Sequence, residues 1–256
     1  MHPLIVIPTY NEVHTLPPMA EALLALGLPD LTVLVVDDNS PDGTGARADE
    51  LARQWDGRIQ VLHRTGRRGL GRAYVDGFRW ALRHGADPIV QMDADFSHAP
   101  RHVPGLLEQS AAYDLVIGSR YVPGGAVDAR WGLGRQVLSA GGNRYARALL
   151  GLRTRDATAG FKCWRGAALE AVNVERIVSD GHVFQIEMTY VAERLGLSML
   201  EMPIYFEDRR VGQSKMLLPI KLEAMWRVVQ VRRRHGHIRA TGAGRPTAEM
   251  SAATRV

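Results

Sequence analysis

The fold is decided by residues 31–44, which read LTVLVVDDNSPDGT. A run of six apolar or β-branched residues leads directly into Asp37 and Asp38, and a turn sequence containing Pro41 and Gly43 follows. A short apolar run of this kind is typical of a strand that is buried on both faces, as in a parallel sheet. Residues 4–12 and 88–95 show the same arrangement, because each places an apolar run immediately before polar or acidic residues.

Strand and helix patterns alternate along the first 120 residues. Strands are predicted at 4–8, 31–36, 59–63, 88–92 and 115–119, with helices between them at 15–26, 45–55, 70–84 and 103–110. This alternation predicts an α/β fold, with a mostly parallel sheet covered by helices on both faces. The pattern changes after Tyr121. An amphipathic segment at 130–150, a strand–helix set at 160–195, a strand at 198–205 and a basic helical pattern at 216–234 follow.

Composition sets bounds on the kind of molecule. Of the 256 residues, 46% are hydrophobic and 23% are charged, so residues 1–239 are expected to form one α/β domain. Residues 240–256 are rich in Ala, Gly and Thr without periodicity, and we predict a disordered tail. The single cysteine, Cys163, excludes a disulfide within the chain and fits a reducing compartment. No basic leader and no run of about 18 uncharged apolar residues occurs, so neither a signal peptide nor a membrane-spanning helix is expected.

The chain is basic, with a net charge of +5 and a pI near 9.6. All but three of its 32 cationic side chains are arginine, which binds phosphates in a planar, bidentate way. The arginine total has a simpler explanation in the base content of the genome, and the pI alone would permit a nucleic-acid-binding protein. The acidic strand ends argue against nucleic acid as a partner, because they would repel a phosphate backbone unless a metal ion lay between.

In parallel α/β sheets, ligands bind beyond the carboxyl ends of the strands. The predicted strands end in Glu12, in Asp38 and in the pair Asp93 and Asp95. Carboxylates bond ribose hydroxyls and hold the divalent cation that a pyrophosphate requires, so these ends predict a nucleotide site with a metal ion. Simpler explanations exist: Glu12 as a helix cap, Asp93 to Asp95 as a solvated loop, and the turn at Asp42 as an N-cap, which for Asp42 is the explanation we favour.

These three strand endings together closely resemble the inverting glycosyltransferases of family 2, which have the GT-A fold, a Rossmann-like nucleotide-sugar-binding sandwich. Four later segments narrow the resemblance to the polyprenyl- or dolichyl-phosphate mannose synthases. They are GSRY at 118–121, TAGFKCWR at 158–165, FQIEM at 184–188 and RRVGQSK at 209–215. The match covers roughly residues 4–220. The QxxRW signature of processive family-2 polymerases is absent from the sequence, which argues for transfer of a single sugar.

The resemblance implies where the donor, GDP-mannose, and its divalent metal, Mg²⁺ or Mn²⁺, are bound. The residues implied for the guanosine site are Pro8, Tyr10, Glu12, Val36 and Asp38; those for ribose, pyrophosphate and metal are Asp93, Ala94 and Asp95; and those that close over the donor phosphates are Arg209 and Lys215. Ser97 stands where some relatives have a glutamine near the metal, and it is the weakest of the implied metal ligands.

The resemblance also implies the acceptor side and the chemistry. Arg120, Arg135 and Ser139 would face the phosphate of a polyprenol, and Asp95, Arg120, Arg209 and Lys215 would be the catalytic residues. In-line attack would invert the sugar and give a β-mannosyl phosphopolyprenol. The nearest alternative is the same chemistry with another nucleotide sugar, such as UDP-glucose.

A polyprenol acceptor implies a membrane surface as a partner. The chain is expected on the cytoplasmic face as a peripheral protein, and some relatives act beside a separate integral membrane protein. Segments at about 123–150 and 216–235 combine apolar and aromatic residues with arginine, which is typical of helices that lie in the headgroup layer. Two core-packing helices with solvated basic faces would explain the same pattern.

Overall fold

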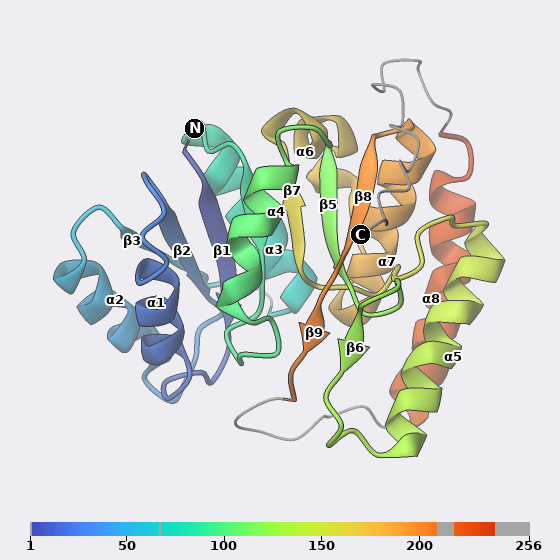
Figure 1. The fold of residues 1–256 in the computed structure, drawn as a ribbon, viewed down its shortest axis with the longest axis horizontal. Helices are drawn as coiled ribbons and strands as arrows, with labels where there is room; N and C mark the ends of the chain where they lie inside the picture. Colours follow the sequence, from blue (N-terminus) through green and yellow to red (C-terminus); the bar gives the residue numbers. More distant parts are fainter. Residues whose placement is uncertain (1, 67, 209–217, 239–256) are drawn as a thin grey trace, which may run out of the picture.

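The structure, a computed structural model, describes residues 2–66, 68–208 and 218–238. Its centre is a seven-stranded sheet in the order β3-β2-β1-β4-β7-β5-β8, and all neighbours are parallel except β7, which runs against β4 and β5 (Figure 1). The mostly parallel α/β sheet predicted from sequence is confirmed. Its strands are β1 (Leu4–Thr9), β2 (Thr32–Asp37), β3 (Ile59–His63), β4 (Ile89–Gln91), β5 (Leu115–Ser119), β7 (Lys162–Trp164) and β8 (Met199–Pro203).

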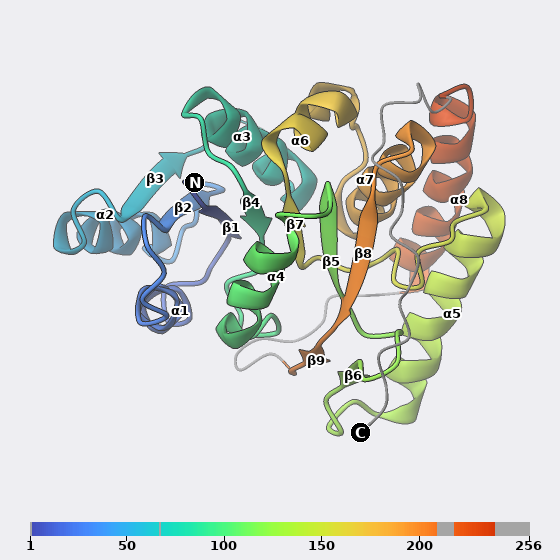
Figure 2. The same ribbon diagram turned by 45° about the horizontal axis from the view of Figure 1, so that its top comes forward.

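Helices cover both faces of the sheet, and two more pack at one end (Figure 2). One face carries α1 (Leu16–Leu24), α2 (Thr44–Gln54) and α4 (Val103–Gln109); the other carries α3 (Leu70–Arg83), α6 (Gly166–Val172) and α7 (Gly181–Leu195). Beyond α7 lie α5 (Leu133–Leu150) and α8 (Leu218–His235). Short 3₁₀ turns occur at η1 (Pro100–His102) and η2 (Val174–Arg176).

The alternation of β1 explains why both faces are covered. Leu4 and Val6 point into the core cluster under α3, whereas Ile5 and Ile7 point into the cluster under α1 and α2. All four side chains are buried, as expected for a strand inside a parallel sheet. Helix α3 approaches β1 closely because Gly77 has no side chain; a Cβ there would lie 2.5 Å from a methyl carbon of Val6.

The predicted strand at 198–205 is wrong in one respect, because it is two strands in two sheets. Pro203 ends β8, and the backbone of Ile204 then turns: its N–H donates to Ser119 O, and its carbonyl accepts from Ala126 N. The chain thereby leaves the main sheet and forms β9 (Tyr205–Phe206), which pairs with β6 (Ala126–Val127). This small sheet lies at the carboxyl ends of the main strands, next to the start of α5 (Figure 1).

A third core cluster joins α5, α7 and α8. It is formed by Ala146 and Leu150 of α5, Ile186 and Tyr190 of α7, and Val228 and Val231 of α8, with their neighbours. The C-terminal parts of α5 and α8 are therefore packed against the body of the protein. The predicted helices at 130–150 and 216–234 are confirmed, while the predicted tail at 240–256 lies outside the described residues.

Candidate active site

A cavity of about 450 Å³ opens at the carboxyl ends of β1, β2 and β4. The strand ends that carry the acids meet here, and seven of the residues implied for the donor line this cavity. Its lining consists of Pro8, Thr9, Tyr10, Glu12, Asp38, Arg68, Gly69, Leu70, Ala73, Asp93, Ala94 and Asp95.

Val36 is the one described donor residue that does not line the cavity. Its side chain is fully buried in the core under α3, where its Cγ2 lies 3.0 Å from the position a Cβ of Gly77 would take. The direction follows from strand alternation, since Val36 shares its face of β2 with Leu34. The Val36 side chain therefore points away from the cavity, although the resemblance implied that Val36 lines the guanosine site. Arg209 and Lys215, the other two implied donor residues, lie outside the described residues.

Asp38 is held in place by two groups that the sequence analysis did not identify. Its Oδ2 accepts from the backbone N–H of Gly69 at 2.7 Å, and its Oδ1 accepts from Nη1 of the buried Arg64. Arg64 also donates through Nε to Asp76 at 2.7 Å. The Asp38 carboxylate is thus fixed before any ligand arrives. The only sequence signal for Arg64 was its place directly after the third predicted strand.

A second missed residue, Arg68, lies beside the cavity. Its Nη1 donates to the Tyr10 hydroxyl at 2.7 Å, its guanidinium lies 4.7 Å from the centre of the Tyr10 ring, and its Nη2 donates to Asn39 O at 3.0 Å. A cation stacked on an aromatic ring presents a flat surface of the kind on which a nucleobase packs. The loop after β3 therefore lines the cavity together with the strand ends.

The two acids after β4 are oriented by different partners. Tyr74 of α3 donates its hydroxyl to Asp93 Oδ1 at 3.0 Å. Burial raises the pKa of Tyr74 well above its usual value and the charge of Asp93 adds to the effect, so Tyr74 remains a donor. Asp95 Oδ1 accepts from the backbone N–H of Ser97 at 3.0 Å and from the Ser97 hydroxyl at 2.6 Å.

Ser97, the weakest of the implied metal ligands, contacts the carboxylate of Asp95. It is 1% exposed, and its hydroxyl is directed at the carboxylate of Asp95, so its contact with that residue orients the acid. Within the described ranges, no three His, Cys, Asp or Glu side chains converge into a preformed metal cage. Asp93 and Asp95 nevertheless fit a hard cation, because Mg²⁺ is commonly held by one or two carboxylates together with substrate phosphates and water.

Asp42 and Glu12 were both given a simpler explanation, as residues that cap a helix. The structure supports it fully for Asp42 and partly for Glu12. Asp42 accepts from the Thr44 backbone at 3.0 Å, from the Thr44 hydroxyl at 2.6 Å and from Val13 N at 3.2 Å, so it stabilises the start of α2. Glu12 both caps a helix and lines the cavity. Its backbone carbonyl accepts from Thr15 N and Leu16 N at the start of α1, yet the residue also lines the cavity.

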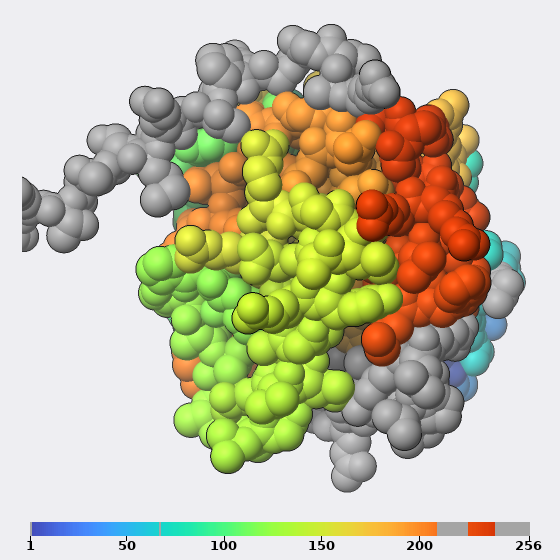
Figure 3. Space-filling model, turned by 90° about the vertical axis from the view of Figure 1, so that its right-hand side faces the viewer, coloured from blue at the N-terminus to red at the C-terminus, as the bar shows by residue number. Residues whose placement is uncertain are grey.

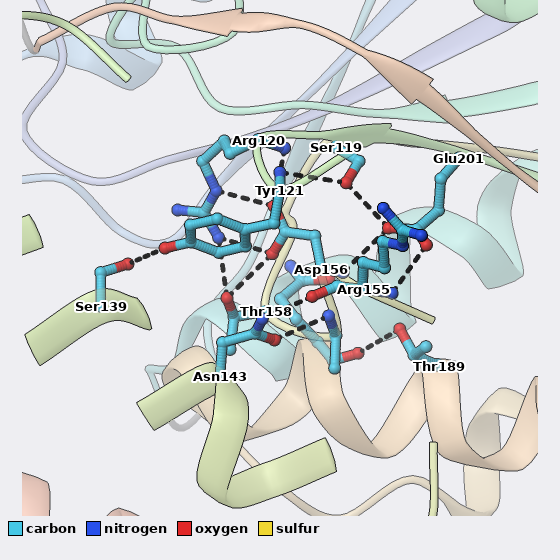
Figure 4. Close-up of polar contacts among 12 residues, drawn as sticks. Ser119, Arg120, Tyr121, Ser139, Asn143, Arg155, Asp156, Thr158, Thr189 and Glu201 are labelled. Carbon is cyan, nitrogen blue, oxygen red and sulfur yellow. Dashed lines mark hydrogen bonds and ion pairs between the residues drawn. The ribbon is translucent and has the colours of Figure 1, made fainter. Parts of the chain in front are cut away.

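Arg120, predicted to face the acceptor, is buried in an ion pair (Figure 4). Its Nε and Nη2 donate to the two carboxylate oxygens of Asp156 at 2.8 and 2.7 Å, and Nη2 also donates to the Thr158 hydroxyl at 2.7 Å. Burial lowers the pKa of Arg120, but the adjacent Asp156 outweighs it and the net shift is upward. Among the described contacts these bonds engage Nε and Nη2 but not Nη1, so much of the guanidinium serves the fold.

Arg135 and Ser139 are four residues apart on α5 and are more accessible than Arg120. Arg135 donates through Nη1 to Asp208 at 2.7 Å, and its guanidinium stacks 3.8 Å from the centre of the Trp131 ring. The Ser139 hydroxyl lies 2.8 Å from that of Tyr121, whose ring lies 5.2 Å from the Arg120 guanidinium (Figure 4). Tyr121 thus lies between Ser139 and Arg120 and contacts both.

The residues implied for the acceptor rest on a partly buried polar network that sequence reasoning missed. Glu201 of β8 accepts from the Ser119 hydroxyl at 2.8 Å and from the backbone N–H groups of Arg155 and Asp156 at 2.6 and 2.8 Å (Figure 4). The side-chain amide of Asn143 on α5 bonds the same loop: its Nδ2 donates to Arg155 O, and its Oδ1 accepts from Ala157 N. These bonds fix the loop that presents Asp156 to Arg120.

Lys162 of β7 lies buried between the two sides. Its Nζ donates to the backbone and side-chain oxygens of Gln185, each at 3.0 Å. Burial lowers the pKa of Lys162 to about 7, although the charge of Asp156 opposes the shift. A lysine in such surroundings is an ionisable group of the interior, which the motif at 158–165 alone did not reveal.

A larger cavity of about 780 Å³ lies between β3, α3 and η2. Four of its charged groups are paired with one another: Arg79 donates to Glu175 at 2.6 Å and lies 3.7 Å from Asp76, which also accepts from Arg64. No strand-end carboxylate lines it. We therefore take the smaller cavity, where the paired acids meet, as the candidate active site.

Comparison with known proteins places the chain among sugar transferases. Residues 4–172 match the family described as Glycosyl transferase family 2. The chain is 46% identical over 230 residues to the undecaprenyl-phosphate mannosyltransferase of Micrococcus luteus, covering 90% of this chain and 93% of that protein. It is 47% identical over 228 residues to the polyprenol monophosphomannose synthase of Mycolicibacterium smegmatis, covering 89% and 85%.

The fold is shared with solved structures of a different transferase. Glucosyl-3-phosphoglycerate synthase from Mycobacterium tuberculosis, solved with Mn²⁺, UDP and glucosyl-3-phosphoglycerate, superposes with a TM-score of 0.65. The sequence identity is 19%, and the match covers 91% of this chain and 80% of that one. At this identity the likeness concerns the fold alone, and it confirms the predicted GT-A architecture.

Proposed function

Since the chain belongs to glycosyltransferase family 2, we propose that it transfers mannose from GDP-mannose to the phosphate of a membrane polyprenol. The observation that carries the proposal is the identity of 46–47% to two proteins named for this chemistry, over 89–90% of the chain. The cavity at the strand ends supports the donor half of the proposal, since Glu12, Asp38, Asp93 and Asp95 all line it.

The donor half of the reaction rests on the acids of the cavity. Asp38 is fixed by Arg64 and Gly69 in an orientation suited to hydrogen-bond donors of the nucleoside, and the Tyr10–Arg68 stack offers a flat packing surface for the base. Asp93 and Asp95 would hold Mg²⁺ or Mn²⁺ against the pyrophosphate. The cation supplies charge neutralisation for the departing GDP.

The acceptor half needs positive charge but no strong base. A phosphate monoester has its second pKa at about 6, so at neutral pH the acceptor is already a nucleophile. We assign Arg135 to this phosphate, because Arg135 is partly exposed on α5 and its stacking on Trp131 holds the planar fork in position. Ser139 adds a hydroxyl one helical turn away. Arg120 keeps Tyr121 and the 156–158 loop in place, and it can offer only Nη1 to the phosphate.

The membrane side of the proposal rests on α5 and α8, which lie next to each other on one face (Figure 3). The N-terminal half of α5 exposes Leu133 and Val137 by 79% and 71%, and α8 exposes Trp226 by 54%, with Arg233 stacked 5.7 Å from the Trp226 ring. The C-terminal parts of the same helices pack in the core, as the core-packing explanation expects. No helix in the described ranges is long and apolar enough to cross a bilayer.

We therefore infer peripheral binding to the cytoplasmic leaflet, with the exposed end of α5 inserted among the headgroups. Exposed apolar residues with arginine beside them suit this layer, and basic residues near an anionic surface contribute about 1 kcal/mol each. Arg135 and Ser139 lie on the same helix as Leu133 and Val137, so this orientation would bring the acceptor site to the lipid phosphate. A separate integral membrane protein is a further expected partner.

The assignment of the donor is tested by parallel incubations with labelled GDP-mannose and labelled UDP-glucose, each with Mn²⁺ and polyprenyl phosphate. Label should pass into the organic extract from GDP-mannose alone, and unlabelled GDP should compete with the donor far better than UDP. Equal incorporation from UDP-glucose would overturn the assignment and favour the alternative donor.

A further inference from the structure

His98 lies outside the donor cavity but touches the loop that carries its acids. Its ring is 2% exposed and stacks on Phe161 with 5.0 Å between the ring centres, while Phe206 contacts it edge-on at 5.5 Å. Gly160 adds to the enclosure, since a Cβ there would lie 3.1 Å from His98 Cε1. A polar ring enclosed in this way is fixed in orientation, and nothing in the proposed transfer uses it directly.

The orientation of the ring fixes the state of one nitrogen. The backbone N–H of Asp93 donates to His98 Nδ1 at 3.0 Å. A nitrogen that accepts a hydrogen bond carries no proton, so Nδ1 provides a lone pair to the first residue of the acidic loop. The contact spans five residues and closes the loop from Asp93 to His98 on itself.

A second, smaller closure lies inside the first. Asp95 Oδ1 accepts from Ser97 N and from the Ser97 hydroxyl, and Phe96 between them has a φ of 65°, in the left-handed region that non-glycine residues rarely adopt. A strained residue persists only where its surroundings hold it. The bond to His98 Nδ1 anchors the end of the loop whose interior contains this strain and the Asp95 carboxylate.

The ring of His98 also reaches toward the acceptor side. Phe206, which contacts His98, lies 5.2 Å from the Arg120 guanidinium and packs edge-on against Trp131 at 5.6 Å. Trp131 in turn carries the stacked guanidinium of Arg135. A continuous column of rings therefore runs from the acidic loop to the arginine of α5.

We propose that His98 is a positioning residue with two separable roles: its Nδ1 lone pair holds the loop that presents Asp93 and Asp95, and its ring sets the distance from that loop to the acceptor arginines. The proposal rests on the proposed function, because it concerns the same donor and acceptor sites. It assigns His98 no contact with substrate.

Two substitutions separate the roles. His98→Phe keeps a ring for Phe161 and Phe206 and removes the lone pair, whereas His98→Asn removes the ring and keeps an oxygen where Nδ1 stands. Loss of one hydrogen bond corresponds to about a fivefold change in an equilibrium constant. His98→Phe should therefore weaken Mn²⁺-dependent binding of GDP about fivefold, measured by calorimetry on the full chain, and His98→Asn should stay within about twofold of the wild type.

Turnover tests the role of the ring. His98→Asn should lower kcat or raise the KM for polyprenyl phosphate while GDP binding is retained. His98→Gln serves as a second comparison, because it lacks the ring like His98→Asn but places its amide beyond the Nδ1 position. It should weaken GDP binding as His98→Phe does, so the test does not depend on the folding of one variant.

The outcomes separate this inference from the proposed function. If the affinity of the wild type for GDP does not depend on Mn²⁺, the proposed metal-dependent donor site is contradicted. The role given to His98 then falls with it. Mn²⁺-dependent binding in the wild type that His98→Phe and His98→Gln leave unchanged would overturn the inference alone. Equal losses in His98→Asn and His98→Gln would do the same, because they would reduce His98 to a packing residue.

Discussion

The proposed donor side and the proposed acceptor side of this molecule are built in different ways. The donor acids follow directly from β1, β2 and β4, so a rigid parallel sheet places them, and their cavity is present without any ligand. The acceptor residues come from a helix and from loops, and the most buried of them, Arg120, is already neutralised by Asp156. The carboxylates of the proposed donor side therefore line a cavity, whereas much of the charge on the proposed acceptor side is engaged within the fold.

The largest effect should come from the donor acids. Asp95→Asn preserves size and can still accept from Ser97, but it removes the negative charge that a divalent cation requires. Loss of several kcal/mol of transition-state stabilisation corresponds to about a thousandfold in kcat/KM. The measurement is transfer of labelled mannose at saturating Mn²⁺, with the exposed Asp56→Asn as a charge-matched control. Activity within tenfold of the wild type would show that Asp95 is no metal ligand.

Breaking the Arg120–Asp156 ion pair should lower the stability of the fold more than it lowers activity. Asp156→Asn leaves Arg120 as a buried charge without its counterion, and breaking such a pair costs about 3–5 kcal/mol. Urea unfolding measures this loss. The exposed pair of Arg47 and Glu50 provides the control, because Glu50→Gln should cost less than about 1 kcal/mol. Equal changes in the two variants would contradict the structural role given to Arg120.

Lys162 on β7, between the two sides, should make stability depend on pH. Its pKa is about 7 in the folded protein and 10.5 as the ordinary value, so between these values the unfolded chain binds more protons. Stability therefore rises with pH, by about 2 kcal/mol from pH 7 to pH 9. Urea unfolding across this range should show the rise, and Lys162→Met should remove it. A wild-type stability that is flat or falling over this range would refute the buried-lysine account.

Arg135 should matter for the acceptor alone. Arg135→Gln removes one charge-assisted contact to phosphate and should raise the KM for polyprenyl phosphate about tenfold, while the affinity for GDP stays unchanged. Arg144→Gln on the exposed side of the same helix removes an equal charge and serves as the control. A weaker affinity for GDP in Arg135→Gln would contradict the claim that Arg135 acts on the acceptor and not on the donor.

The smallest effect should be on the membrane. The double substitution of Leu133→Ser and Val137→Ser removes apolar surface that is exposed in the structure, so folding should be unaffected. Partitioning onto anionic liposomes should fall about fivefold, measured by flotation at low salt. The wild type should bind less as salt rises. A wild type that remains in the supernatant under these conditions would show that another component brings it to the lipid.

The sheet and the donor residues were predictable because strand alternation and strand ends are local properties of the sequence. Asp38, Asp93 and Asp95 were found in this way, whereas Val36 was carried over from a motif and the alternation of β2 directs its side chain into the core. Arg64 was missed because its role depends on a contact with a residue 26 positions away. His98 was missed because its role depends on the rings of Phe161 and Phe206, which are distant in sequence.

The acceptor side was less predictable for a related reason. No local pattern in GSRY distinguishes an arginine that faces a substrate from one that pairs with Asp156, 36 residues further along the chain. The same limit applies to the split of residues 198–205, where the hydrogen bonds of Ile204 to two distant strands decide the course of the chain.

The most direct test of the account is the identity of the product. The protein, incubated with GDP-mannose, Mn²⁺ and polyprenyl phosphate, should yield a lipid whose mass is that of the acceptor plus one hexose, and whose anomeric carbon, read by NMR, has the β configuration. The account predicts this product from the wild type and none from Asp95→Asn. An α-linked product, a lipid with several sugars, or no lipid product from the wild type would contradict it.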